Sequence, residues 1–294
     1  MSKRQPALPM AVRLILTHPG GSHKDEFLAC CVLAAVHGCR IVRREPEAED
    51  LQDAGVAVVD VGGEHEPKLS NFDHHQFPVD HAPLCALSLV LMDLGIYDDA
   101  RSFCDWLETA ERMDVTGPNE TAKWLGVDRD SLARLNSPID ITLLRRFAQV
   151  SELHPEEPLY EVMRWIGEDL LEFIRSLRER LEYIAQYAQV WEVEDTKVLF
   201  MPRTDPLPAE PSAGLGRYLE SFGLESEVTA LIYPDRRGSG YGLGRHRDSP
   251  YFDFTQIDSQ PDVHFAHVRG FVAKTSAADE ARLKELLRAA RVSA

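Results

Sequence analysis

The stretch Asn71–Gln76 reads Asn-Phe-Asp-His-His-Gln and combines one carboxylate with two adjacent imidazoles. Asp73, His74 and His75 are costly to bury without a partner, whereas a metal ion accepts both kinds of side chain as ligands. A His-His pair alone is a weak signal, because such pairs are common in loops. Other acidic and imidazole residues, however, follow other apolar runs of the chain. We therefore take a metal site as the hypothesis.

Further candidate ligands lie where predicted strands and helices begin or end. His18 follows the apolar run Ala11–Thr17, and Asp60 interrupts the apolar run Gly55–Val61. Burying a carboxylate on such a strand is expensive unless a cation compensates it. The complete candidate set has four histidines and four aspartates: His18, His23, Asp25, Asp60, Asp73, His74, His75 and Asp114.

Mixed imidazole and carboxylate ligands without cysteine favour Mn²⁺ first, followed by Mg²⁺, Co²⁺ or Zn²⁺. The number of candidates fits two ions that share a bridging carboxylate, the pair used for in-line phosphoryl displacement. Single members also have plain structural interpretations, such as a turn histidine for His18 and a helix N-terminal charge for Asp25. Asp60 is the hardest to explain without a cation, and the coincidence of the whole set favours a metal site.

A parallel α/β sheet is the fold expected to position these residues. Ala11–Thr17, Arg40–Arg43 and Gly55–Val61 are typical of short buried strands, with a helix from His23 to about Gly38 after the first strand. An acidic helical piece precedes the third strand. This order implies right-handed crossovers, and sites in such sheets gather beyond the carboxyl ends of the strands. The candidate ligands fall at those ends.

The remainder of the chain is predicted to form helices and then a second, mixed sheet. The elements expected are helices over Pro83–Leu94, Asp98–Asp114, Leu132–Val150, about Pro158 to Val190 and Ala277–Arg291, and strands over Lys197–Phe200, Thr229–Tyr233, Tyr241–Gly244 and Val263–Val268. The helix after Pro158 has apolar residues spaced by threes and fours, which favours a connecting helix over a dimeric coiled coil. We expect a catalytic α/β domain over residues 1–155, a connecting helix over 156–190 and a smaller α+β substrate-binding domain over 191–294.

The formal net charge of −16 argues against affinity for long duplex DNA, which a protein gains by neutralising many phosphates. The five cysteines show no CxxC spacing, and Met1–Met10 lacks the apolar core of a secretory signal. No apolar run is long enough to span a bilayer. We expect a cytoplasmic protein that acts on a short substrate and binds no membrane, and a homodimer stays open.

One basic segment stands out in this acidic chain. Asp235–Arg247 has four arginines against one aspartate, a local charge of +3 from 4 − 1, and several glycines. Glycine-rich backbone and guanidinium groups suit phosphate binding, whereas four arginines on a hairpin are often merely solvated. Arg236 and Arg237 fit both interpretations equally. The candidate substrate-binding residues are Arg245, His246, His264, His267 and Arg269.

The motifs resemble those of the DHH phosphoesterase superfamily and, within it, the Myg-type (melanocyte-proliferating-gene) exonuclease family. The matching stretches are THPGGSHKDE (Thr17–Glu26), VVDVGG (Val58–Gly63), FDHHQ (Phe72–Gln76), the Asp114 segment and VHFAHVRGFVAKT (Val263–Thr275). His23 stands where the usual DHH motif H-x-x-x-D-x-D has its first aspartate. Val272-Ala273 replaces the double glycine of the family's closing segment. The resemblance is strong over residues 11–120 and weak after residue 190.

The resemblance implies a two-domain enzyme with two Mn²⁺ ions in its N-terminal domain. The implied roles are ligands of the first motif for His18, His23 and Asp25, a bridge for Asp60, and ligands of the second ion for His74 and Asp114. His75 would face the scissile phosphate, and Asp73 would orient a histidine N–H.

The function expected is a Mn²⁺-dependent phosphodiesterase or exonuclease that hydrolyses short oligoribonucleotides by two-metal attack of water on phosphorus. Alternatives with the same metal clamp are an inorganic pyrophosphatase and a cyclic-dinucleotide phosphodiesterase. A different class of alternative is a metal-binding regulatory or scaffold protein without catalysis. A metal-dependent protein hydrolase is disfavoured, because the chain has no HExxH spacing.

Overall fold

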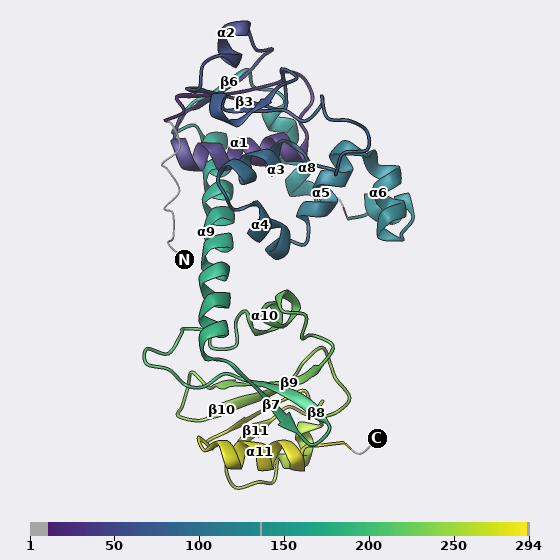
Figure 1. Cartoon of the computed structure of the whole chain (residues 1–294), viewed down its shortest axis with the longest axis vertical. Coiled ribbons are helices and arrows are strands. Elements are labelled where there is room, and N and C mark those ends of the chain that lie inside the picture. Colours follow the sequence, from purple (N-terminus) through teal and green to yellow (C-terminus); the bar gives the residue numbers. More distant parts are fainter. Residues whose placement is uncertain (1–10, 136, 293–294) are drawn as a thin grey trace. The chain divides into compact units, whose positions relative to one another are not determined.

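The computed structural model describes residues 11–135 and 137–292 of the chain. Met1–Met10, for which the sequence predicts no secretory signal, lies outside the described residues. The chain forms two compact units, Met1–Arg175 and Ser176–Ala294. Their boundary falls inside the long helix α9 (Pro158–Tyr187; Figure 1), which ends three residues before the predicted end at Val190. None of the described helices is long and apolar enough to cross a membrane.

A six-stranded sheet with a parallel centre organises the first unit. Its strand order is β4-β5-β3-β1-β2-β6. The parallel strands are β1 (Leu14–Thr17), β2 (Arg40–Arg43), β3 (Val56–Val59) and β5 (Asn71–Phe72). The edge strands β4 (His65–Glu66) and β6 (Glu152–Leu153) are antiparallel to their neighbours. The predicted α/β fold with a parallel sheet is confirmed.

Helices cover both faces of this sheet, which explains why β3 consists of valines and alanine buried on both sides. Helix α1 (Lys24–His37) and helix α3 (Ala86–Asp93) pack side by side on one face (Figure 1). The short helix α2 (Ala48–Leu51) packs against β3, where Leu51 joins a cluster of valines. Gly38 ends α1 in a left-handed conformation with φ of 64°, which favours glycine.

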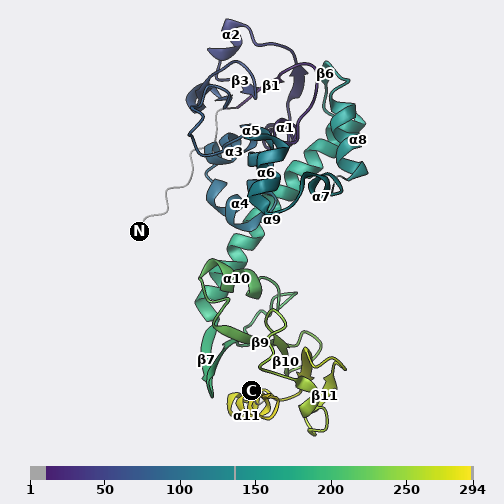
Figure 2. The ribbon, with the colours of Figure 1, turned by 90° about the vertical axis from the view of Figure 1, so that its right-hand side faces the viewer.

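The other helices of the first unit differ in part from the prediction. They are α4 (Tyr97–Phe103), α5 (Leu107–Val115), α6 (Gly117–Leu125), α7 (Arg129–Ala133) and α8 (Pro138–Phe147). The single helix predicted over Asp98–Asp114 is wrong, because the backbone leaves the helical region at Cys104 and restarts at Leu107. Gly117 and Pro118 begin α6, which packs beside α5 (Figure 2). Proline is tolerated there because a first-turn N–H has no helical partner.

The second unit contains a mixed sheet, as predicted. Its order is β11-β12-β10-β9-β8-β7, with β8 and β9 parallel and the other neighbours antiparallel. The strands are β7 (Gln189–Val193), β8 (Thr196–Phe200), β9 (Val228–Pro234), β10 (Tyr241–Arg245), β11 (Val263–Ala266) and β12 (Val272–Thr275). The sequence prediction missed β7, β12 and the short helix α10 (Leu215–Ser221).

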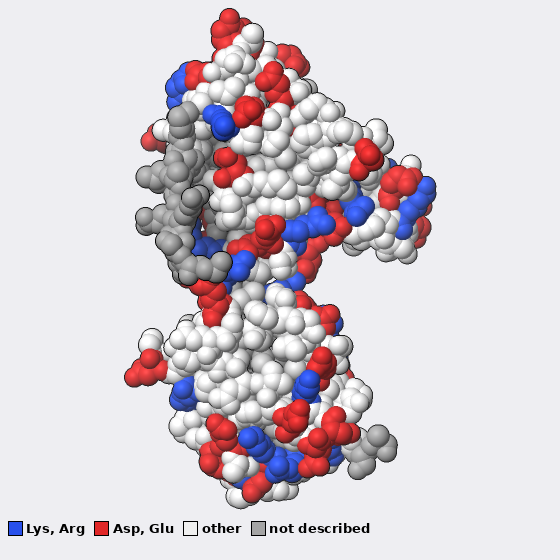
Figure 3. All heavy atoms as spheres, in the orientation of Figure 1, with Lys and Arg blue, Asp and Glu red and all other residues white. Residues whose placement is uncertain are grey.

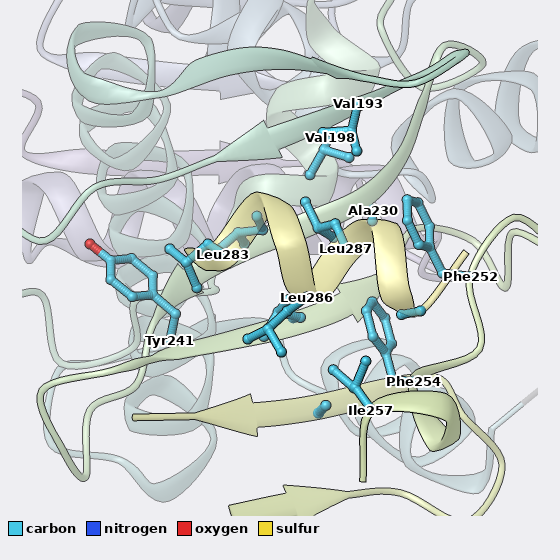
Figure 4. Packing of buried hydrophobic residues seen from close by; sticks show 14 of the residues in the cluster. Val193, Val198, Ala230, Tyr241, Phe252, Phe254, Ile257, Leu283, Leu286 and Leu287 are labelled. Carbon is cyan, nitrogen blue, oxygen red and sulfur yellow. The ribbon is translucent and has the colours of Figure 1, made fainter. Parts of the chain in front are cut away.

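The last helix, α11 (Glu280–Ala289), closes the core of the second unit. Leu283, Leu286 and Leu287 are buried and share one face of the helix, because they are three and four residues apart. In Figure 4, Leu287 lies toward the sheet residue Ala230, and Leu283 lies on the side of Tyr241 in the same cluster. This core stabilises the second unit by burial of apolar surface.

Gly167 on α9 provides a test of packing within the first unit. A Cβ added at Gly167 would lie 2.1 Å from the carbonyl oxygen of Cys31 on α1. We expect Gly167→Ala to lower the free energy of unfolding, because overpacking costs roughly 1–3 kcal/mol and the gain in helix propensity is at most about 1 kcal/mol. Urea denaturation followed by circular dichroism measures the change.

Gly216→Ala is the matched control for Gly167→Ala. Gly216 also lies in a helix, but a Cβ there meets no heavy atom within 4 Å. This substitution should leave stability unchanged or raise it by up to about 1 kcal/mol. If both alanine variants gained stability, the close packing of α9 on α1 would be contradicted.

Candidate metal centre

The candidate ligands of the first unit lie beyond the carboxyl ends of three neighbouring parallel strands. His18 follows β1, Asp60 follows β3, and Asp73 and His74 follow β5. Because the strand order is β5-β3-β1, Asp60 lies at the middle of the three strand ends. The position agrees with the rule that sites in parallel sheets form beyond the carboxyl ends of strands.

Asp60 lies between two histidines. The Nε2 atom of His74 is 3.1 Å from Asp60 Oδ1, and the Nε2 atom of His18 is 3.5 Å from Asp60 Oδ2. The side chain of Asp60 is buried, and its backbone has φ of 59°, in the left-handed region that few residues other than glycine, asparagine and aspartate adopt. The N–H of Asp60 donates to the carbonyl oxygen of Phe72 at 3.1 Å, which holds this turn against β5.

Three overlapping groups of the described residues bring ligand atoms within 4.8 Å of one another. They are His18 with His23, Glu26 and Asp60; Asp60 with His74 and His75; and His23 with Asp25 and Asp114. Asp60 belongs to two of these groups, as a carboxylate shared by two ions would. All six predicted ligands fall in the groups, and their assignment as ligands stays a prediction.

Asp25 and Asp114 reach the cluster from helices. Asp25 lies in the first turn of α1 and Asp114 in the last turn of α5. Asp25 Oδ2 accepts a hydrogen bond from the N–H of Ala86 at 3.3 Å, whereas Oδ1 is buried and has no hydrogen-bond partner among the described residues. Burial, followed by the charges of Asp60 and Asp114, raises the pKa of Asp25 well above its usual value. A buried carboxylate oxygen without a donor is a suitable ligand for a cation.

The two strand-end histidines provide the positive charge that these carboxylates need. Hydrogen bonds to Asp60 and Glu26 raise the pKa of His18 to about 10. For His74, burial lowers the pKa, but hydrogen bonds to Asp114 and Asp60 outweigh it and raise the pKa to about 10. Burial of Asp60 is in turn outweighed by His18 and His74, so that its pKa falls to about 2. Divalent cations bound by neutral imidazoles satisfy the same carboxylates, so the donor set fits such ions.

Hydrogen bonds orient His18 and His75. The Nδ1 atom of His18 donates to the carbonyl oxygen of Pro19 at 2.9 Å, which directs Nε2 at the carboxylates and makes it a suitable ligand atom once its proton leaves. The Nδ1 atom of His75 lies 2.7 Å from Asp73 Oδ1, while the His75 side chain is 63% exposed. Asp73 also accepts from the backbone N–H groups of Gly63 and His75. These contacts suit the orienting role predicted for Asp73 and leave His75 accessible to a substrate.

Glu26 and Arg43 are site residues that the sequence reasoning did not select. Glu26 is fully buried, and its Oε2 atom contacts His18 Nε2. Arg43, also buried, donates to Glu26 Oε1 at 3.0 Å. The signal for Glu26 was its place as the last residue of the first motif, directly after Asp25. Arg43 ends the neighbouring strand β2, and no motif pointed to it.

The predicted substrate-binding residues of the second unit have different surroundings. The Nε and Nη2 atoms of Arg245 donate to the carbonyl oxygens of Gly270 and Arg269 at 3.0 and 2.8 Å. These two nitrogens therefore already bind the loop before β12. Burial, followed by the charge of Arg247, lowers the pKa of His246. The ring of His267 accepts from the N–H of Arg269 at 3.1 Å, and the Arg269 side chain is exposed.

His264 is the predicted residue that lines a cavity of ≈580 Å³ in the second unit. Other lining residues are Arg237, Ser239, Phe265, Lys274 and Ser276. At its base, the buried carboxylate of Asp235 accepts from Lys274 Nζ at 3.0 Å and from the N–H of Arg237. The cavity therefore presents an arginine, a histidine and an exposed aromatic ring.

The fold and the site define an α/β protein with a histidine and carboxylate cluster suited to divalent cations. Residues 14–87 match the model of the MYG1_exonuc family, described as an uncharacterised protein family (UPF0160). The MYG1 exonuclease of Bos taurus is 46% identical over 79 residues, and that of Homo sapiens is 45% identical over 78 residues. These matches show a similarity to MYG1 exonucleases over the N-terminal part of the chain.

The matched stretch covers about a fifth of each of these two relatives, 20% in both cases. Two solved structures align with most of the chain at low similarity. They are a pGpG-specific phosphodiesterase, PggH, from Vibrio cholerae (TM-score 0.30, 13% identity, 95% of this chain and 99% of that one) and RecJ in complex with Mn²⁺ from Thermus thermophilus (TM-score 0.28, 14% identity, 97% and 53%). The similarity to MYG1 exonucleases rests on the sequence match and not on these structures.

Asp60→Asn tests the shared ligand. Asparagine has the same shape and tolerates φ of 59°, so the backbone should be unaffected, while one charge is lost from both groups that contain Asp60. We expect close to two Mn²⁺ per chain in the wild type and reduced occupancy of both sites in the variant, measured by elemental analysis after dialysis. Mn²⁺ should raise the melting temperature of the wild type much more than that of the variant.

Asp53→Asn is the control for charge removal, because Asp53 is an exposed partner of Arg13 outside the cluster. It should retain both ions. Full occupancy in Asp60→Asn would rule out Asp60 as a ligand of either ion, and the loss of a single ion would rule out the bridging role.

Proposed function

We propose that the protein is a Mn²⁺-dependent phosphodiesterase of the exonuclease type, which hydrolyses short oligoribonucleotides. The observation that carries the proposal is Asp60, a buried carboxylate shared by two groups of ligand atoms beside an exposed histidine. The family match supports a nuclease, because the relatives are named exonucleases. The donor set without cysteine supports a hard divalent cation, with Mn²⁺ first.

The cluster would hold two ions through His18, His23, Asp25, Asp60, His74 and Asp114. When bound, such ions supply a nucleophilic water and stabilise the charge that develops on phosphate oxygens. Asp73 fixes Nδ1 of His75, and this leaves the Nε2 atom of the exposed ring to face a substrate phosphate. From there His75 would donate a hydrogen bond to a phosphate oxygen as its negative charge increases.

The cavity of the second unit would hold another part of the substrate. The net charge of −16 disfavours polyanions, and Lys and Arg are interspersed with Asp and Glu on the face shown in Figure 3. A cavity with Arg237 and His264 offers donors for a phosphate, and Phe265, 42% exposed, offers a face on which a base can stack. The open cavity suits one or two nucleotides better than a long duplex.

A substrate panel tests the proposed reaction. With Mn²⁺ present, short RNA, a dinucleotide, pyrophosphate and a cyclic dinucleotide are incubated with the protein, and the products are separated by chromatography. We expect hydrolysis of short RNA and the dinucleotide. Turnover of pyrophosphate or the cyclic dinucleotide alone would replace the proposed substrate. Metal binding without turnover of any of the four would favour a regulatory protein.

His75→Ala is the variant that connects the site to this reaction. It should retain Mn²⁺ and lose about 100-fold or more in kcat, because it removes a donor used mainly in the transition state. His74→Ala should lose metal affinity together with rate, since His74 contacts both Asp60 and Asp114. His81→Ala, at another exposed loop histidine, serves as the control and should behave like the wild type. Rescue of His75→Ala, but not His74→Ala, by excess Mn²⁺ would exchange the two roles.

Arg237→Gln tests the cavity as a substrate site. Loss of a charge-assisted hydrogen bond to phosphate, worth about 1.5–3 kcal/mol, should raise KM for a short oligonucleotide roughly tenfold or more. Metal content should not change, and bis-p-nitrophenyl phosphate, which offers one phosphate, should be hydrolysed normally. The adjacent Arg236 pairs with Glu210 and does not line the cavity, so Arg236→Gln is the matched control. Equal KM values for the two variants would remove the cavity from substrate binding.

A further inference from the structure

Arg43 is a buried arginine beneath the loop that joins β1 to α1. Its side chain is 1% exposed. The Nη1 atom donates to the carbonyl oxygens of Gly20 and Phe147 at 3.2 and 2.9 Å, and Nη2 donates to the carbonyl oxygen of Gly21 at 2.9 Å. A buried guanidinium is costly without such partners, so these bonds account for its position. Arg43 thereby ties together the strand β2, this loop and the end of α8.

The loop that Arg43 holds carries two of the predicted metal ligands. His18 and His23 flank Gly20 and Gly21, whose carbonyl oxygens Arg43 binds. A glycine-containing loop has many backbone conformations of similar energy, so its geometry depends on such outside contacts. The carbon of the guanidinium also lies 4.6 Å from the centroid of the Phe147 ring, which fixes its plane.

Glu26 connects Arg43 to the candidate ligands. Its Oε1 atom accepts from Arg43 Nη2 at 3.0 Å. Its Oε2 atom contacts His18 Nε2 and accepts from the backbone N–H of His23 at 3.1 Å. The two oxygens of one buried carboxylate therefore have different partners, with the arginine on one side and the candidate metal ligands on the other.

We propose that Arg43 is a positioning residue of the metal centre, which fixes the His18–His23 loop and presents Glu26 Oε2 to the same ion as His18 and Asp60. This inference rests on the proposed metal centre and adds Glu26 as a carboxylate ligand. It explains why an arginine occupies the buried end of β2, where the planar fork reaches carbonyl groups and a carboxylate at the same time.

Arg43→Lys tests the proposal, because lysine keeps the charge but offers its donors from a single nitrogen. We expect Mn²⁺ affinity, measured by isothermal titration calorimetry on the full chain, to fall roughly 10- to 100-fold, as for other residues that orient metal ligands. Arg44→Lys is the matched control. Arg44 is the next residue in the chain and pairs with Asp50 at 2.6 and 3.0 Å, away from the loop side chains. Its metal affinity should equal that of the wild type.

Hydrogen exchange of the metal-free proteins separates positioning from general stability. Arg43→Lys should increase exchange in the peptide that contains residues 18–23, while peptides from β3 keep wild-type protection. A lower melting temperature with wild-type Mn²⁺ affinity would overturn the proposal, and so would an unchanged loop with weakened binding. Failure of the wild type to bind Mn²⁺ would instead overturn the metal centre itself, and this inference with it.

Glu26→Gln keeps the test decisive where Arg43→Lys does not fold. The amide oxygen still accepts from Arg43, but the group facing His18 loses its negative charge. We expect Mn²⁺ affinity to fall at least tenfold. Exchange should increase only at the N–H of His23, which loses its acceptor Oε2, while Gly20 and Gly21 keep their contacts with Arg43. Wild-type affinity in Glu26→Gln would exclude Glu26 as a ligand and contradict the proposal.

Discussion

Repulsion between buried carboxylates is the constraint on which the first unit depends. Asp25, Asp60 and Asp114 converge where water is largely excluded, and charges interact more strongly there than at the surface. Hydrogen bonds from His18 and His74 to these carboxylates offset the repulsion. The carboxylates favour the charged imidazolium and therefore raise the pKa values of both histidines. A cluster that attracts positive charge so strongly is also a cluster that divalent cations can occupy once protons leave.

The parts of the fold that position these groups are rigid. Three segments that carry candidate ligands leave neighbouring parallel strands, whose spacing is set by backbone hydrogen bonds. Asp25 and Asp114 are held by helix ends. Glu111, one turn before Asp114, is buried and accepts from Ser88 Oγ and Tyr97 OH at 2.7 Å each. It also pairs with Arg101, so that one carboxylate joins α3, α4 and α5. Rigid support of this kind holds ligands within the small tolerances that metal binding requires.

The charged groups of the second unit are mostly paired and do not form a cluster of like charges. Its buried Asp235 is already paired with Lys274, and its arginines are divided between backbone carbonyls, acidic partners and the cavity. Such a surface offers hydrogen bonds to a ligand without concentrating charge. The match to the family model ends at residue 87, so a role of this unit in substrate binding depends on its own side chains.

Much of the α/β fold could be predicted from the sequence alone, and so could the grouping of most candidate metal ligands. Short apolar runs, turn residues and polar residues at their ends are local signals, and strand order in a parallel sheet brings His18, Asp60 and His74 together by a general rule. Local signals were weaker for helix breaks, as at Cys104, where tertiary packing overrides a continuous amphipathic pattern.

Only the tertiary structure showed which groups donate hydrogen bonds to each candidate metal ligand and which side chains hold these ligands in position. Arg43 lies 17 residues after Glu26 in the chain, yet its guanidinium pairs with that carboxylate. Arg245 looked available for phosphate until its contacts with Gly270 and Arg269 appeared, because the partners of a guanidinium come from segments distant in sequence. The sequence by itself therefore determined the type of chemistry, since that depends on residue types near strand ends. The fold determined the roles of single residues, since those depend on distances and burial that arise only after distant segments pack together.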